Sequence, residues 1–190
     1  MLKQADENVF LTIVKLMSLK GIHFTTEELA RELGTSKRTV YMYFANKEEI
    51  IDQTISFIFA GIHRSDQQIA SNASLAYPDK LKQVAYYLPD GYQLGILVRH
   101  ADDLRRYYPI IWTKVRSYID AGWDRLIALV EEGMHNGVVR HIDTQMLRIM
   151  LDQTLIALLS RENAGELSVS FEQEMKAMFD IVLHGILIES

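Results

Sequence analysis

The sequence predicts an all-α protein of about nine helices, for three reasons. Apolar residues recur at helical spacing along nearly the whole chain, whereas the alternation typical of β-strands is scarce. The 190 residues include only three prolines, and none of them lies in the first 77 positions. An apolar fraction of 48% and a charged fraction of 24% are ordinary for a globular protein, and the chain is long enough to bury a substantial core.

The first four predicted helices follow from their apolar faces. The first covers about 6–20, where Gly21 ends it. Two short helices near 26–33 and 37–44 come next, and a long helix over about 47–70 follows them. The apolar face of the long helix consists of Ile51, Ile55, Ile58, Phe59 and Ile62.

Five further helices are predicted after the polar stretch at 71–74. Two of them begin at a proline, Pro78 and Pro109, because proline is favoured in the first turn of a helix. The predicted ranges are about 78–88, 91–105, 109–134, 143–162 and 168–188.

Several classes of function find no support in the sequence. There is no cysteine, and the six histidines show no metal-binding spacing, so we expect no metal site. No phosphate loop, nucleophile motif or acid–base pair stands out, so we expect no catalytic residue, no cofactor and no enzyme activity. The N-terminus lacks the apolar run of a signal peptide, and the apolar stretch 181–188 is too short to cross a membrane. We therefore expect a cytoplasmic protein without membrane contact.

Residues 26–44 fit a helix-turn-helix, in which two short helices cross steeply over a tight turn. Thr25 or Thr26 can cap the first helix through its hydroxyl. Ala30 is small where the second helix must pass close by, and Gly34 permits the left-handed backbone that the turn needs. The apolar positions of the two helices are Leu29, Leu33 and Val40.

The charge of this segment differs from that of the chain. The net charge of −5 does not by itself indicate a nucleic-acid binder. Residues 34–47, however, contain Lys37, Arg38 and Lys47 and no acid. Since phosphate neutralisation is local, an acidic protein can bind DNA through one basic face. The alternative is a solvated helix that carries a few charges.

A set of residues between about 10 and 50 has a highly specific spacing. It comprises Gly21, Phe24, Thr25, Thr26, Leu29, Ala30, Leu33, Gly34, Ser36, Thr39, Val40, Tyr41, Tyr43, Phe44, Asn46, Lys47, Glu48 and Glu49. This set resembles the DNA-binding head of the tetracycline-repressor (TetR) family of transcriptional regulators, and the rest of the chain resembles the family only in layout. The resemblance implies a DNA-binding domain over 1–46 and a ligand-binding and dimerisation domain over 47–190.

The resemblance also implies contacts with double-stranded DNA. Thr26 would place a hydroxyl and a helix N-terminus against phosphate, and Lys47 would pair with phosphate. Lys37, Arg38 and Thr39 would face base edges in the major groove. The two tyrosines of the second helix would contact the backbone or thymine methyl groups. The full candidate set is Thr25, Thr26, Thr35, Ser36, Lys37, Arg38, Thr39, Tyr41, Tyr43 and Lys47.

Two positions depart from the family pattern. Thr35 stands where an apolar residue usually follows the turn glycine, and we expect it to cap the recognition helix jointly with Ser36. Arg38 is bulky where a small residue often sits, and we expect it to read a guanine bidentately.

The last two predicted helices have broad apolar faces. One consists of Met146, Leu147, Met150, Leu151, Leu155, Leu158 and Leu159; the other of Phe171, Met175, Met178, Phe179, Val182 and Ile186. These faces could simply be buried within one subunit. Their width, the small Gly185 and the family resemblance favour a homodimer through these helices, which would let two recognition helices read a palindromic site.

A ligand cavity is expected within 78–134, which is rich in amphipathic aromatic residues. The same aromatics could instead be core, and the charged residues near position 100 could be a solvated face. The candidates for contact with an unknown small-molecule effector are Tyr86, Tyr92, Arg99, His100, Asp103, Tyr108, Trp112 and Trp123.

These observations favour a homodimeric, ligand-released repressor that binds a palindromic operator. An all-α small-molecule-binding or protein-interaction module without DNA binding is the alternative, and a small helical enzyme is a third hypothesis. Neither explains why the acid-free basic segment lies on the second helix of the helix-turn-helix.

Overall fold

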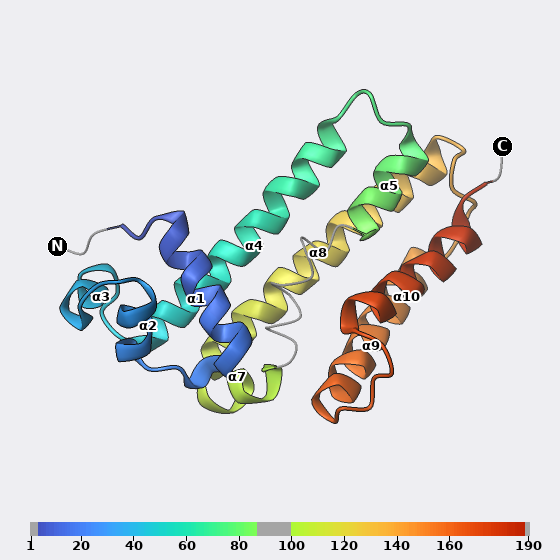
Figure 1. Cartoon of the computed structure of the whole chain (residues 1–190). Coiled ribbons are helices and arrows are strands. Elements are labelled where there is room, and N and C mark those ends of the chain that lie inside the picture. The colour runs from blue at the N-terminus through green and yellow to red at the C-terminus, as the bar shows by residue number, and fades with distance from the viewer. Residues whose placement is uncertain (1–3, 87–99, 189–190) are drawn as a thin grey trace.

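A computed structural model of the protein describes residues 4–86 and 100–188. The described part contains nine α-helices, one short 3₁₀ helix and no β-strand, which confirms the predicted all-α fold class (Figure 1). None of its helices has the length and apolar character needed to cross a membrane.

The N-terminal head consists of short helices, each stopped by an identifiable cap. Their bounds are α1 Glu7–Lys20, the 3₁₀ helix η1 Gly21–His23, α2 Thr26–Glu32 and α3 Lys37–Tyr43. The Asp6 carboxylate caps α1 by accepting from the backbone N–H of Val9 at 3.0 Å. The boundaries of these three α-helices lie within one residue of the predicted ones, because the capping residues could be recognised in the sequence.

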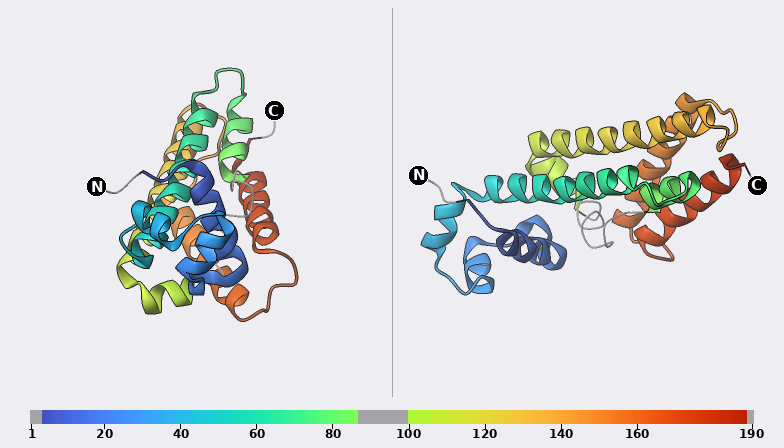
Figure 2. Two further views of the ribbon diagram at one scale, coloured as in Figure 1. Left: turned by 60° about the vertical axis from the view of Figure 1, so that its left-hand side comes forward. Right: turned by 90° about the horizontal axis from the view of Figure 1, so that it is seen from above.

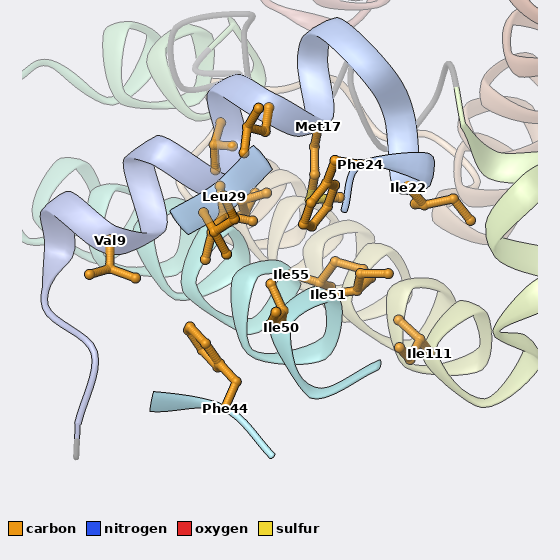
Figure 3. Packing of buried hydrophobic residues seen from close by; sticks show 14 of the residues in the cluster. Val9, Met17, Ile22, Phe24, Leu29, Phe44, Ile50, Ile51, Ile55 and Ile111 are labelled. Atoms are coloured by element: carbon orange, nitrogen blue, oxygen red, sulfur yellow. The ribbon is translucent and has the colours of Figure 1, made fainter. Parts of the chain in front are cut away.

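The core of the head is closed by α4, Lys47–Ser71. Phe24, Leu29 and Phe44 are fully buried, and they pack with Ile50, Ile51 and Ile55 of α4 in one apolar cluster (Figure 3). Ile111 of α8 belongs to the same cluster (Figure 3). The head is therefore fastened to the body by shared apolar packing rather than by a linker.

The remaining helices form the body. Their bounds are α5 Tyr77–Tyr86, α7 Ala101–Tyr107, α8 Pro109–His135, α9 Thr144–Asn163 and α10 Phe171–Ile186. The long helices α4 and α8 run side by side along the molecule, with the head at one end and the C-terminus at the other (Figures 1 and 2). A second apolar cluster joins α5 and α8 to α9 and α10.

Two predicted helices in the body had wrong boundaries. The last helix begins at Phe171 rather than 168, because Ser170 and Gln173 form a capping box that fixes its first turn, and it ends at Ile186 rather than 188. The helix predicted over 91–105 ends at Tyr107 instead, directly before Pro109 opens α8, and its first predicted part, 91–99, lies outside the described residues.

The chain after α10 is bound to the α8–α9 connection. Val139 and Leu187 form an isolated antiparallel bridge. Arg140 N–H donates to Ile186 C=O at 2.9 Å, and Ile188 N–H donates to Val138 C=O at 3.0 Å. These bonds fix the far end of the body.

Candidate nucleic-acid interface and ligand cavity

Helix α2 begins with a complete capping box. The Thr25 hydroxyl accepts from Glu28 N–H at 3.2 Å, and the Glu28 carboxylate accepts from Thr25 N–H at 2.8 Å. Glu28 also pairs with Lys20 of α1. The Lys20 hydrogen bond, followed by that of the Thr25 backbone, lowers the pKa of Glu28 to about 2. Of the two threonines that the sequence offered as the cap of α2, Thr25 is therefore the one that caps it.

The turn between α2 and α3 has the backbone that the sequence predicted. Gly34 has φ +63°, which favours glycine, and the next residue, Thr35, donates its N–H to Ala30 C=O at 2.8 Å. The Ser36 hydroxyl caps α3 by accepting from Thr39 N–H at 3.1 Å. No cap by the Thr35 side chain is found there, so the predicted joint cap was wrong and Ser36 does this alone.

Most of the DNA-contact candidates on α3 are accessible. Lys37 and Arg38 are exposed, and Tyr41 keeps 42% of its surface exposed. Thr39 and Tyr43 are half-buried, Tyr43 against the core of the head. Val40 is fully buried, as predicted, so it orients the helix with the other side chains outward.

Thr26 differs from the other candidates because its side chain is buried, with 8% exposed. Its hydroxyl lies 3.4 Å from the Glu27 carboxylate. The accessible hydroxyl at this helix start belongs to Thr25.

The charges of α3 are partly compensated, contrary to the sequence-based expectation. Lys37 pairs with Glu27 of α2, and that hydrogen bond raises the pKa of Lys37 and lowers the pKa of Glu27. No ion pair is found within the described residues for Arg38 or Lys47. The Lys47 ammonium lies 5.1 Å from the centre of the Phe24 ring, and partial burial lowers its pKa. The fold therefore places Glu27, an acid from outside residues 34–47, beside Lys37.

The body holds a cavity of about 130 Å³. Its walls come from α4, α5, α8, α9 and α10, and apolar side chains, both aliphatic and aromatic, dominate. The lining residues in the described part are Phe59, Ile62, Asp66, Val84, Ala85, Trp112, Val115, Tyr118, Ile119, Gly122, Trp123, Arg125, Leu126, Leu155, Leu159, Phe171, Met175 and Phe179. Phe59 stacks on Tyr118 with ring centres 4.6 Å apart, which joins α4 to α8 at this wall.

An ion pair also lines the cavity. Arg125 of α8 donates through Nε at 3.1 Å and through Nη2 at 2.9 Å, both to Oδ2 of Asp66 on α4. Burial raises the pKa of Asp66, and the Arg125 hydrogen bond opposes that shift. Sequence reasoning missed this pair. The available signal was Asp66 itself, which interrupts the apolar face of α4 between Ile62 and Ile69.

Trp123 contributes the other polar atom of interest. Its side chain is 7% exposed, and its Nε1 is buried with no hydrogen-bond partner among the described residues. A buried donor left unpaired is unusual in proteins and calls for an explanation.

Among the predicted effector contacts whose side chains the structure describes, Trp112 and Trp123 alone line this cavity. Asp103 instead lies against the head, with a carboxylate oxygen 3.1 Å from His23 Nε2. His100 lies against Gly21, where an added Cβ would come within 2.7 Å of the imidazole ring. Tyr108 packs on the cluster that joins head and body.

Three further candidates have no described side-chain position. Tyr86 ends α5, but its side chain is outside the described set, and Tyr92 and Arg99 lie outside the described residues altogether. In the described ranges no group of three or more potential ligands could hold a metal ion.

Helices α9 and α10 expose several large apolar side chains. The large apolar residues with more than two-fifths of their surface exposed on these two helices are Met146, Ile149, Met150, Ile156 and Ile181. By contrast, many of the residues predicted to form these faces, such as Leu151 and Phe179, are buried within the subunit. An added Cβ on Gly185 would meet nothing within 4 Å, so the backbone is open to close approach.

Comparison with known proteins agrees with this geometry. Residues 12–54 match the sequence profile of the bacterial regulatory proteins of the tetR family. The HTH-type transcriptional regulator YvaF of Bacillus subtilis is 26% identical over 184 residues, and the match covers 95% of each chain.

Solved structures share the fold over nearly the whole chain. A transcriptional regulator from Saccharomonospora viridis in complex with choline has a TM-score of 0.74 at 19% identity, covering 95% of this chain and 96% of that one. FadR from Bacillus subtilis in complex with stearoyl-CoA has a TM-score of 0.66 at 20% identity, covering 94% and 97%. The TetR-family regulator PfmR from Thermus thermophilus has a TM-score of 0.67 at 21% identity, covering 97% and 100%. The helix-turn-helix head thus matches the tetR family profile, and the chain shares the all-α architecture of these solved regulators over nearly its whole length.

Proposed function

We propose that the protein is a cytoplasmic repressor without catalytic activity, which binds a palindromic operator as a homodimer and leaves it when a small molecule occupies the body. The observation that carries the proposal is the outward position of α3 beside a cap-fixed α2, with Arg38 exposed and free of any ion pair in the described residues. Such a helix can enter the major groove of DNA.

The proposed DNA surface uses the candidate residues in three ways. Arg38 and Thr39 face base edges, since they lie at the start of α3. Thr25 and Lys47 contact phosphate from the starts of α2 and α4. Thr26 supports this surface from beneath, because it is buried. The remaining members that stay in the proposed surface are Thr35, Ser36, Lys37, Tyr41 and Tyr43.

Homodimerisation is proposed through α9 and α10. Their exposed apolar side chains cover an outer face that is otherwise left to water, and patches of this kind mark interaction sites. Residues 1–46 then serve as the DNA-binding domain, and 47–190 as the domain for ligand and partner.

Effector control is proposed to pass along α4. This helix begins under the head, where Ile50, Ile51 and Ile55 are buried, and it reaches the cavity with Phe59, Ile62 and Asp66 as wall residues. A ligand that binds more tightly to one position of α4 shifts the population toward that position. The relatives crystallised with choline and stearoyl-CoA support a small-molecule role for such bodies.

Mobility-shift titration tests the DNA-binding part of this proposal. We expect the protein to bind duplex DNA from upstream of its own or a neighbouring gene, with an affinity that falls steeply between two salt concentrations. Lys47→Ala should weaken binding to all sequences and reduce the salt slope by about one charge, since it removes one phosphate contact. A DNA affinity that does not change with salt would contradict phosphate contacts by the head. An unchanged salt slope for Lys47→Ala would show that Lys47 does not contact phosphate.

A further inference from the structure

The outward face of α3 carries an apolar side chain that is absent from the predicted DNA contacts. Met42 keeps 40% of its surface exposed, and it belongs to neither of the two apolar clusters of the described residues. Core packing therefore does not account for a methionine at this position. Helix α3 itself lies at the outer end of the head, away from the body (Figures 1 and 2).

Helix geometry places Met42 beside Arg38. At about 100° per residue, Arg38 and Met42 are each about 160° around the helix from Val40, which is fully buried. The two tyrosines lie closer to Val40: Tyr41 is about 100° from it and Tyr43 about 60°, and Tyr43 packs against the core of the head. Arg38 and Met42 therefore form the part of α3 that points most directly away from the protein.

The chemistry of these two side chains gives them different targets. Arg38 offers a fork of N–H donors, which suits the acceptors of guanine. Met42 has a flexible thioether side chain without a donor, so it suits an apolar surface. The apolar group on a base edge in the major groove is the C5-methyl group of thymine. The modified base 5-methylcytosine carries the same group at the same ring position.

We propose that Met42 is a specificity-determining residue, which contacts the C5-methyl group of a pyrimidine in the major groove. Arg38 and Met42 are four residues apart, which is about 6 Å along the helix axis. With a rise of about 3.4 Å per base pair, the methyl group lies within about two base pairs of the pair that Arg38 contacts. This inference rests on the proposed DNA-binding function and specifies one feature of the operator.

Replacing thymine with uracil removes this methyl group and nothing else. The test uses the full-length protein and a duplex selected from a random library by binding to the wild type. Fluorescence anisotropy compares this duplex with copies in which one thymine at a time is replaced by uracil. We expect one thymine per half-site whose replacement weakens wild-type binding by about fourfold, the scale of burying one methyl group. For Met42→Ala the same replacement should leave the affinity unchanged.

A second pair of duplexes tests the other source of the methyl group. The thymine–adenine pair at the responsive position is replaced by a cytosine–guanine pair, with or without a C5-methyl group on the cytosine. The methylated duplex should bind the wild type more tightly than the unmethylated one, again by about fourfold. Met42→Ala should bind both duplexes equally.

Two further variants are controls for this comparison. Leu19→Ala removes another exposed apolar side chain of the head, from α1, and should keep the wild-type response to uracil. Tyr41→Ala removes the aromatic neighbour of Met42; it should weaken binding to all duplexes alike and also keep the uracil response. The urea midpoint of Met42→Ala should equal that of the wild type, because the side chain is exposed and lies outside both clusters.

Three outcomes would overturn the inference: no thymine of the selected duplex responds to uracil, the response persists in Met42→Ala, or methylation of the cytosine brings no gain in affinity. Failure of the proposed function looks different. In that case the library yields no duplex that the wild type binds in a salt-sensitive way, whereas salt-sensitive binding without a methyl effect contradicts the role of Met42 alone.

Discussion

Single ion pairs in the head decide how many positive side chains remain available for contact with DNA. The sequence window 34–47 suggested uncompensated cations, but the fold places Glu27 against Lys37. This pairing could not be predicted from the sequence, because it depends on the crossing angle of α2 and α3. Val40, Gly34 and the Ser36 cap could be predicted, since burial at one helix position, positive φ and an N-cap each leave a local signal.

Arg38 is expected to contribute sequence preference rather than general affinity. Arg38→Ala should reduce the preference for a site selected from a random duplex library over scrambled DNA by about tenfold, the scale of one bidentate base contact. Fluorescence anisotropy with both duplexes measures the ratio. Lys37→Ala is the control: its ammonium already serves Glu27, so the variant should weaken binding to both duplexes alike. A uniform loss for Arg38→Ala would place that residue on phosphate instead.

Glu28 is expected to make stability depend on acid pH. Its pKa in the folded protein is about 2, against an ordinary value of 4.5. A lowered carboxyl pKa stabilises the fold above the ordinary value, and that contribution is lost as the pH falls from about 4.5 towards 2. Urea midpoints at pH 7 and pH 3 should therefore fall less for Glu28→Gln than for the wild type. Glu7→Gln, at an exposed site with no ion pair in the described residues, should behave like the wild type; equal falls for all three proteins would disprove the contribution.

At the scale of helices, predicted and observed ranges agree where a cap or a proline marks the boundary. Pro109 and the Thr25 capping box are examples. Ion pairs between helices could not be predicted from the sequence. Asp66 and Arg125 are 59 positions apart, and the packing of α4 on α8 brings them together. For the same reason the sequence placed Asp103 near a ligand, whereas the fold places it beside His23.

Helix α8 depends on a glycine at its crowded end. A Cβ at Gly133 would lie 2.6 Å from Val139 Cγ2 and 3.0 Å from Tyr77 Cε1. Gly133→Ala should therefore destabilise the protein by about 1–3 kcal/mol through overpacking, although alanine is the better helix former. In thermal or urea unfolding, Gly61→Ala in α4 is the control; its nearest neighbour is the flexible end of Arg64 at 4.0 Å, so it should stabilise slightly. A stabilised Gly133→Ala protein would show that Val139 yields easily.

At the scale of the molecule, two separate apolar clusters hold the fold together. One joins the head to α4, α7 and α8, and the other holds the rest of the body together. The sequence predicted the fold class and the helical layout, but it could not separate the inner from the outer face of α9 and α10, because both faces are apolar. Burial shows that Leu147 faces inward whereas Ile149 faces outward.

The proposed dimer gives a direct test of that outer face. Ile181 on α10 is 76% exposed, and Ile110 at the start of α8 is 79% exposed. Ile181→Glu should convert the dimer to a monomer in sedimentation velocity, because it would bury a charge in the interface. Ile110→Glu introduces the same charge at an equally exposed isoleucine elsewhere and should sediment as the wild type. If the Ile181→Glu protein stayed dimeric, the interface would not include this part of α10.

Helix α4 is unbroken from Lys47 to Ser71, and this continuity makes it a lever. At a rise of 1.5 Å per residue, Asp66 lies about 28 Å along the axis from Lys47. A tilt of about 5° about the cavity end would then carry the head by roughly 2.5 Å. In a twofold pair the two heads would separate by up to about 5 Å, a large error against the ~34 Å repeat of successive major grooves. A small displacement of α4 at the cavity would thus be large enough to matter at the DNA, because the helix carries it over a distance much longer than the displacement itself.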